Sequence, residues 1–240
     1  MDEGVPDAAP SPAAPAAHGR TEPPPLELTG VLKSWSSQPR PVLDRVDLQL
    51  EPGSATAISG RNGAGKTTLL RIAGGLIGAE EGTVRVAGLD PDRDRTEFQR
   101  RIGFLAAGNS GLYARLKVEH HLELWTRLAL MRRRDRARAI EEALAAFALE
   151  PLCGRRVDRL SMGQRQRLRI ALAFVHAPTL VLLDEPATSL DEEGIALLQH
   201  ALDSLKQRGG GALVCLPSGW EQLLAIDRSL VLTDGRLEPA

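Results

Sequence analysis

The most constraining feature of the sequence is a glycine-rich stretch, residues 60–67, with the sequence GRNGAGKT. It fits the pattern G-x-x-x-x-G-K-[ST], whose glycines let backbone N–H groups point into one concavity and wrap phosphate oxygens. A small-residue, β-branched run at 54–59 precedes the stretch, and a helical period follows from Lys66 to about Gly74. A strand, this loop and a helix together predict a phosphate site at the positive end of the helix.

The side chains of this loop match the chemistry of a nucleoside triphosphate. Lys66 would reach the β- and γ-phosphates, and the Thr67 hydroxyl would ligate Mg²⁺. The chain has four lysines among its 30 basic residues, so a lysine at this position is informative. A chance glycine-rich turn would not explain the matching flanks, lysine and threonine. The predicted nucleotide contacts in this region are Gly60, Arg61, Asn62, Gly63, Ala64, Gly65, Lys66, Thr67 and Thr68.

A second motif ends an apolar run with two carboxylates. Residues 180–183 are continuously apolar, as expected of a parallel strand buried on both faces. Asp184 follows at the carboxyl end of this strand, where ligands bind in such sheets, and can hold Mg²⁺ through water. Glu185 is then placed to polarise an attacking water as the catalytic carboxylate. Alone the motif is nonspecific, but a phosphate loop about 120 residues upstream makes it specific.

A third motif begins a helix. Ser161 is a good N-cap residue, and its hydroxyl, the backbone N–H of Gly163 and the helix N-terminus would make a second phosphate-binding end. In isolation the motif fits a capped surface helix equally well. Its residues are Leu160, Ser161, Met162, Gly163 and Gln164.

The rest of the chain predicts an α/β core with a parallel sheet, because strands alternate with helices. Residues 42–50 alternate apolar and polar side chains, 212–216 are apolar, and 230–233 followed by Asp234-Gly235 predict a terminal hairpin. We expect one domain over 26–240, with a mostly helical, Arg- and Ala-rich subdomain at about 95–157.

Composition excludes several other classes of protein. Residues 1–25 hold seven of the sixteen prolines, which predicts a disordered tail, and they lack the basic and apolar regions of a signal peptide. No apolar stretch reaches the ~20 residues of a membrane span. A net charge of −1 argues against a protein that coats nucleic acid, and two cysteines do not make a disulfide framework, which favours a cytoplasmic chain.

Taken together, the motifs over 26–240 resemble the ATP-binding subunit of an ABC transporter. Residues 160–164 resemble the family's Leu-Ser-Gly-Gly-Gln signature, and Ser161 lies 23 residues before Asp184, as in the family. Residues 184–186 resemble the Walker B motif with its catalytic glutamate, and 188–191 resemble the D-loop of the dimer interface. The resemblance implies a P-loop core of the ABC ATPase type, with an antiparallel β portion at its start and a helical subdomain.

The same resemblance implies cofactors and partners. ATP and Mg²⁺ would lie between the loop 60–67 of one subunit and the segment 160–164 of a second subunit, in a homodimer or a heterodimer. Without a membrane span, the chain would dock on a separate permease and lie on the inner face of the cell membrane, with no nucleic acid involved. Residues 111–116 resemble the corresponding region of exporter-type subunits, which favours export. The sequence does not indicate the transported substrate, because no residue of this subunit is expected to contact it.

Three departures from the family pattern concern turnover. Residues 102–108 lack the family's glutamine, although Asn109 is close, and residues 216–221 lack its switch histidine. Met162 replaces the first signature glycine. We therefore expect ATP binding with weak hydrolysis, and a low-turnover regulatory subunit is the alternative. An ABC ATPase of translation or DNA repair would need a second cassette or a long coiled coil, which 240 residues do not accommodate.

Two further features allow two interpretations each. Trp35 falls where the family has an aromatic residue that stacks on adenine, and a core position is the alternative. The basic cluster at 132–136 is typical of a solvated helix face, and contact with anionic lipid or nucleic acid is the alternative.

Overall fold

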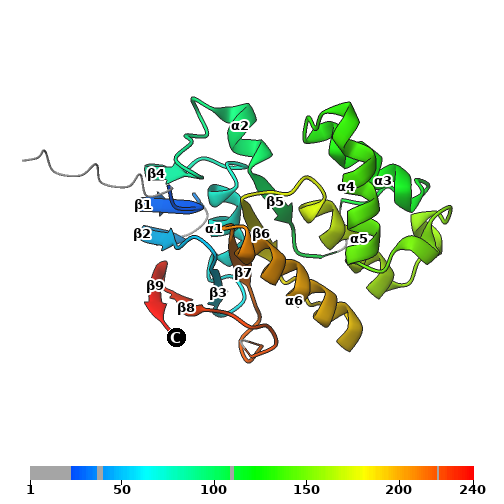
Figure 1. Ribbon diagram of the computed structural model, residues 1–240. Helices are drawn as coiled ribbons and strands as arrows, with labels where there is room; N and C mark the ends of the chain where they lie inside the picture. The colour runs from blue at the N-terminus through cyan, green and yellow to red at the C-terminus, as the bar shows by residue number, and fades with distance from the viewer. Residues whose placement is uncertain (1–22, 37–39, 109–110, 221) are drawn as a thin grey trace, which may run out of the picture.

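The computed structural model describes residues 23–36, 40–108, 111–220 and 222–240, and they form two β-sheets flanked by helices (Figure 1). The smaller sheet is antiparallel with strand order β2-β1-β4, and the larger has the order β5-β6-β7-β3-β8-β9. The strands are β1 (Leu26–Lys33), β2 (Leu43–Leu50), β3 (Ala55–Ser59), β4 (Glu81–Arg85), β5 (Ile102–Leu105), β6 (Leu180–Asp184), β7 (Gly211–Cys215), β8 (Arg228–Thr233) and β9 (Arg236–Pro239).

The larger sheet carries the predicted parallel core. Strands β5, β6, β7, β3 and β8 pair in parallel, so their carboxyl ends meet at one edge. Every residue of β3, β6 and β7 is buried, which explains why these strands consist mainly of apolar and small residues and do not alternate with exposed polar ones. The predicted terminal hairpin is confirmed, since β8 and β9 pair antiparallel around Asp234-Gly235.

Alternate side chains of each central strand pack into two separate cores. Along β6, Val181 and Leu183 join a cluster with α3, α5 and α6, whereas Leu180 and Leu182 join a cluster with α1 and the smaller sheet. This division follows from the period of two in a strand. Figure 1 shows the green helices α3 and α4 on one side of the main sheet and the smaller sheet on the other.

The helices are 6 to 16 residues long and pack against the main sheet or against one another. Two 3₁₀ turns at Glu150–Leu152 and Val157–Arg159 lead from α4 to α5. No helix in the described ranges is both long enough and apolar enough to cross a membrane. The helices are α1 (Lys66–Ala73), α2 (Arg95–Arg100), α3 (Val118–Leu128), α4 (Arg133–Ala146), α5 (Met162–Phe174) and α6 (Glu192–Gln207).

Two sequence expectations need correction. The range 95–157, predicted to be mostly helical, contains β5, which pairs with β6 in the main sheet. Four residues are too few for a strand period to be visible beside the arginines that precede them. Pro25, predicted to belong to the disordered tail, is buried, and its carbonyl accepts a hydrogen bond from the N–H of Ala87 at 3.3 Å. Residues 1–22 of that tail lie outside the described residues.

Candidate nucleotide-binding site

The phosphate loop runs from the end of β3 into the start of α1, as the sequence predicted. Its first and last glycines have φ of +142° at Gly60 and +110° at Gly65, which side-chain-bearing residues rarely adopt. A Cβ at Gly60 would lie 2.6 Å from the carbonyl oxygen of Leu232, and one at Gly65 would lie 2.8 Å from that of Val42. Glycine is therefore required at both ends for the loop to pack against its neighbours.

Lys66 is the first residue of α1 and is buried. Its Nζ donates to the carbonyl oxygens of Gly60 at 2.6 Å and Arg61 at 3.3 Å. The ammonium therefore lies across the mouth of the loop, held by neutral acceptors. Phosphate oxygens carry negative charge and attract the ammonium more strongly than neutral carbonyls do, so they could replace these carbonyls favourably.

The structure brings Thr67 and Asp184 together, although 117 residues separate them. The Thr67 hydroxyl donates to Oδ2 of Asp184 at 2.7 Å, and the carboxylate is only 2% exposed. A hydroxyl and a carboxylate are hard oxygen ligands, which Mg²⁺ prefers together with several waters. The residues therefore fit a magnesium site of the predicted composition. No group of three His, Cys, Asp or Glu side chains suited to a metal occurs among the described residues.

Glu185 begins the loop that leaves β6 and is half-buried. Its backbone has a φ of +51°, which is uncommon for a residue with a side chain, and its N–H donates to the carbonyl of Cys215 at 3.0 Å. Burial raises the pKa of the Cys215 thiol well above its usual value, and the nearby Asp184 carboxylate raises it further. The thiol is therefore protonated, and the carboxylates remain the candidate proton acceptors at this edge.

The segment after β7 lies beside the two carboxylates, because Cys215 pairs with Asp184. Over the described residues 216–220 it carries no histidine: Pro217 is half-buried and Ser218 is exposed. Asn109, near the position of the missing glutamine, lies outside the described residues.

A hollow of about 510 Å³ lies beside the phosphate loop. Its lining combines residues 61–64 of the loop with residues 40–42 and 232–235. Trp35 belongs to the connection that leads to 40–42 and is 40% exposed, so a core role for it is wrong. The Nζ of Lys33 lies 4.9 Å from the centre of its indole ring. Stacking of Trp35 on a base stays a prediction.

The signature segment starts α5 with a complete capping box. The Ser161 hydroxyl accepts from the N–H of Gln164 at 3.2 Å, and the Ser161 N–H donates to the Gln164 side chain at 3.0 Å. Met162 occupies the first helical position with its side chain 57% exposed, so the backbone accommodates it. A Cβ at Gly163 would lie 3.0 Å from the carbonyl oxygen of Ser189, so the retained glycine is the one with little space. No described hydrogen bond joins this segment to the phosphate loop.

Sequence reasoning missed a buried polar chain that connects three parts of the site. Arg169 donates to the side chain of Gln166 at 2.7 Å and to the carbonyl of Ala106 at 2.5 Å. Gln166 in turn donates to the carbonyl of Pro186 at 2.8 Å. Burial lowers the pKa of the Arg169 guanidinium from its usual value. These hydrogen bonds link the segment after β5, helix α5 and Pro186, the residue that follows Glu185.

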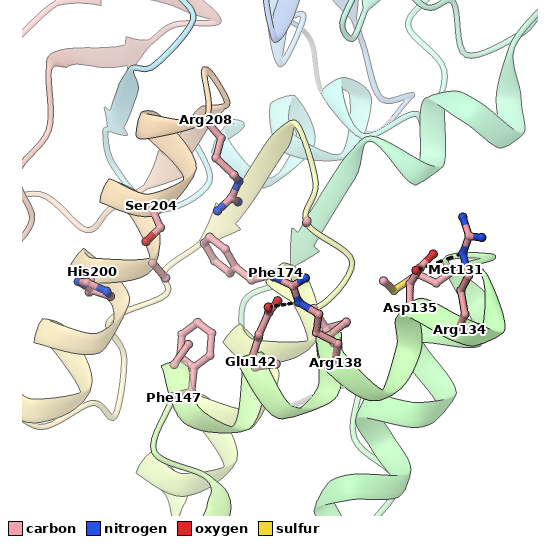
Figure 2. Close-up of a pocket in the computed structure, with 16 residues that line it drawn as sticks. Met131, Arg134, Asp135, Arg138, Glu142, Phe147, Phe174, His200, Ser204 and Arg208 are labelled. Atoms are coloured by element: carbon pink, nitrogen blue, oxygen red, sulfur yellow. Dashed lines mark hydrogen bonds and ion pairs between the residues drawn. The ribbon is translucent and has the colours of Figure 1, made fainter.

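A second cleft, of about 500 Å³, lies between α4, α5 and α6 (Figure 2). Phe147 and Phe174 form part of its wall, with ring centroids 5.9 Å apart. Its charged groups include two ion pairs on α4, Arg138 with Glu142 at 2.7 Å and Arg134 with Asp135 at 3.6 Å. The cleft shares no lining residue with the phosphate loop or with the two carboxylates, so it is not the predicted site.

Comparisons with known proteins agree with these motifs. The model of the family described as ABC transporter matches residues 43–188. The ABC transporter ATP-binding protein NatA of Bacillus subtilis is 36% identical over 68% of this chain and 66% of its own length. The spermidine/putrescine import ATP-binding protein PotA of Hahella chejuensis is 31% identical over 91% of this chain and 59% of its own length. The chain thus spans about three fifths to two thirds of these relatives.

Solved structures share most of this fold. The structure of the ATP-binding subunit of an ABC transporter has a TM-score of 0.80 and 26% identity, covering 88% of this chain and 87% of its own. A dimeric ATP-binding cassette in a post-hydrolysis state, bound to ADP and phosphate, has a TM-score of 0.76 and 27% identity, covering 89% of this chain and 96% of its own. The predicted fold class, with its antiparallel β portion and helices, is confirmed.

Proposed function

This chain belongs to the ABC transporter family as an ATP-binding subunit. We propose that it binds and hydrolyses Mg–ATP to energise export through a separate permease. One observation carries the site assignment. Thr67 at the start of α1 and Asp184 at the end of β6 meet at 2.7 Å, with Glu185 directly adjacent. Hard oxygen ligands, a phosphate loop and a second carboxylate then occupy one edge of the sheet.

Different residues of this chain have different roles in hydrolysis. The Lys66 ammonium exchanges its carbonyl partners for phosphate oxygens and holds the β- and γ-phosphates. Glu185 accepts the proton of the attacking water as general base. Thr67 and Asp184 hold Mg²⁺, which when bound neutralises charge that develops on the phosphates. The hollow beside the loop is large enough for part of a nucleotide, and Trp35 is available to cover the base.

A second ATP-binding subunit completes the site in this proposal. Ser161 caps α5, so the N-terminus of this helix offers a hydroxyl and backbone donors to a phosphate of the partner's nucleotide. The close approach of Gly163 to Ser189 places this end of α5 against the D-loop segment of the same chain. The two segments of one chain therefore present one continuous surface to the second subunit.

Turnover in the isolated chain is expected to be slow. Pro217 and Ser218 stand beside the carboxylates where the family has a histidine that contacts the γ-phosphate. Loss of a positioned donor at developing negative charge typically costs ~10²–10³ in rate. This observation also supports the second candidate, a regulatory subunit that binds ATP with little hydrolysis.

Export and a position on the inner face of the cell membrane are the finer parts of the proposal. They rest on the resemblance of residues 111–116 to exporter-type subunits. In this segment the N–H of Tyr113 donates to Nε2 of His121 at 2.9 Å, which fixes it against α3. The name of PotA states import for that relative, so direction needs its own test. Uptake of a labelled substrate into inverted vesicles, rather than release from them, would support export.

Paired variants test the ATPase proposal. Lys66→Ala is expected to abolish ATP binding, because the phosphate charge loses its main compensating group. Glu185→Gln is expected to bind ATP normally, hydrolyse it at least a hundredfold more slowly and accumulate as an ATP-bound dimer. The matched control is Glu192→Gln, an exposed carboxylate on the first turn of α6. Binding by titration, phosphate release and light scattering measure the three properties.

Two outcomes would contradict the assignment. Wild-type ATP affinity in Lys66→Ala would exclude the phosphate loop as the binding site. A wild-type rate in Glu185→Gln would exclude Glu185 as the general base.

A further inference from the structure

The end of α3, the start of α4 and the turn between them, residues 127–134 with the sequence RLALMRRR, expose large apolar side chains beside a run of arginines. We name these residues the α3–α4 tip. Leu128 is 66% exposed and Leu130 is 56% exposed. More than half of each leucine is therefore exposed, and packing within the described chain leaves this apolar surface uncovered.

The arginines of the tip are placed where they weaken the helix that follows. Arg132 is the N-cap of α4, without a side-chain hydrogen bond to the helix, and Arg133 is its first helical residue. A helix N-terminus carries partial positive charge and favours Ser, Thr, Asp or Asn at the cap. Arg134 pairs with Asp135 at 3.6 Å (Figure 2). Within the described ranges, Arg132 and Arg133 form no ion pair.

Leu130 adds backbone strain at the same place. Its φ is +55°, in the left-handed region that glycine and asparagine tolerate far better than leucine. Exposed leucines, unfavourable cations and a strained turn thus coincide within a few residues. Such a conflict between local preference and observed structure is expected where a surface serves a function.

The tip lies at the edge of the main sheet opposite the phosphate loop. Met131 shares a small polar cavity with Ala177 and Thr179, which immediately precede β6. The phosphate loop instead follows the carboxyl end of β3, and β3 and β6 run in the same direction through β7. A ligand at the tip would therefore leave the nucleotide site and its dimer surface open.

We propose that the α3–α4 tip binds the surface of an anionic lipid bilayer. Arg132, Arg133 and Arg134 meet lipid phosphates, while Leu128 and Leu130 enter the interface between headgroups and acyl chains. Exposed leucines favour a bilayer over a nucleic acid, whose binding sites are mainly polar and basic. The inference goes beyond the proposed function, because the chain itself contacts lipid independently of any permease and of ATP.

Vesicle sedimentation of the full chain tests this surface. The vesicles contain equimolar phosphatidylcholine and phosphatidylglycerol, and phosphatidylcholine vesicles are the neutral comparison. Each arginine near an anionic surface contributes ~1 kcal/mol, or about fivefold in partition coefficient, so Arg132→Gln/Arg133→Gln/Arg134→Gln is expected to lose about a hundredfold. The matched control Arg45→Gln/Arg85→Gln/Arg228→Gln removes equal charge from exposed positions on β2, β4 and β8, and is expected to bind as the wild type does.

A second variant separates binding from folding. Leu130→Asn relieves the positive φ, so the melting temperature is expected to stay the same or rise while vesicle binding weakens several-fold. Failure of the wild-type chain to sediment with anionic vesicles would overturn the proposal, and this result is expected if the true partner is an acidic protein. Equal losses of binding in the two triple arginine variants would also overturn it. ATP affinity, measured on the same samples, reports on the proposed function separately.

Discussion

Removal of the Thr67 hydroxyl tests the pairing of Thr67 with Asp184, on which the predicted metal site rests, even without nucleotide. Thr67→Val keeps the shape of the side chain but deletes the donor to Asp184, whose carboxylate is buried and accepts at 2.7 Å. A hydrogen bond to a charged group contributes ~1.5–3 kcal/mol, and loss of one partner leaves the other desolvated. We therefore expect a loss of about 2–3 kcal/mol in the free energy of unfolding.

Urea unfolding in the presence of a chelator and without nucleotide measures this loss. For a chain of this size each kcal/mol lowers the melting temperature by ~2–4 °C, so a fall of about 4–12 °C should accompany it. Thr67→Ser, which retains the hydroxyl, is the matched control and should remain closer to the wild type. Equal stability of wild type and Thr67→Val would show that the hydroxyl does not support Asp184, and the site assignment would lose the contact that carries it.

Two other predictions concern pH and turnover. Burial lowers the pKa values of His121 and His176 below 6.5, so the unfolded chain binds protons near pH 6.5 that the native chain does not. The free energy of unfolding should therefore fall as pH drops below about 6.5. The variant His121→Gln, monitored by thermal unfolding from pH 7 to pH 5, should show a smaller fall. The same slope in variant and wild type would contradict the role of His121. Separately, Ser218→His or Pro217→His should raise the steady-state ATPase rate by up to ~10²-fold at unchanged ATP affinity; a fast wild type would refute the reasoning, and no gain from either histidine would favour the regulatory subunit.

The sequence predicts the sheet well where burial imposes a simple pattern. Strands β3, β6 and β7 are buried on both faces, so β6 and β7 are short, mainly apolar runs and β3 is a run of small and β-branched residues. The hairpin of β8 and β9 is visible because Asp234-Gly235 supplies its turn. Strand β5 is not visible, because four residues carry too little periodicity to compete with the helical pattern around them.

The site was predictable in its local motifs and not in its long-range supports. Glycine positions, Lys66, Thr67 and the two carboxylates are set by loop geometry and phosphate chemistry, which leave a fixed spacing in the chain. Arg169 and Gln166 leave no such trace, because their outer partners, Ala106 and Pro186, contribute backbone carbonyls. Any residue type can supply a carbonyl, so only the fold shows which ones these side chains reach.

The structure also gives a physical reason for the placement of the proposed general base. Glu185 has a φ of +51° and Ser189, four residues later, has one of +67°, although glycine would relieve the strain at either position. Two backbone hydrogen bonds hold the first of these turns: Glu185 donates to Cys215 at 3.0 Å, and Thr188 donates to Glu185 at 3.3 Å. Because these bonds hold the strained turn at the carboxyl end of β6, the chain changes direction directly after Asp184, and Asp184 keeps its contact with Thr67. The carboxylate needed for proton transfer can therefore follow directly after the carboxylate needed for the metal, and glycine at 185 would remove strain only by removing the base.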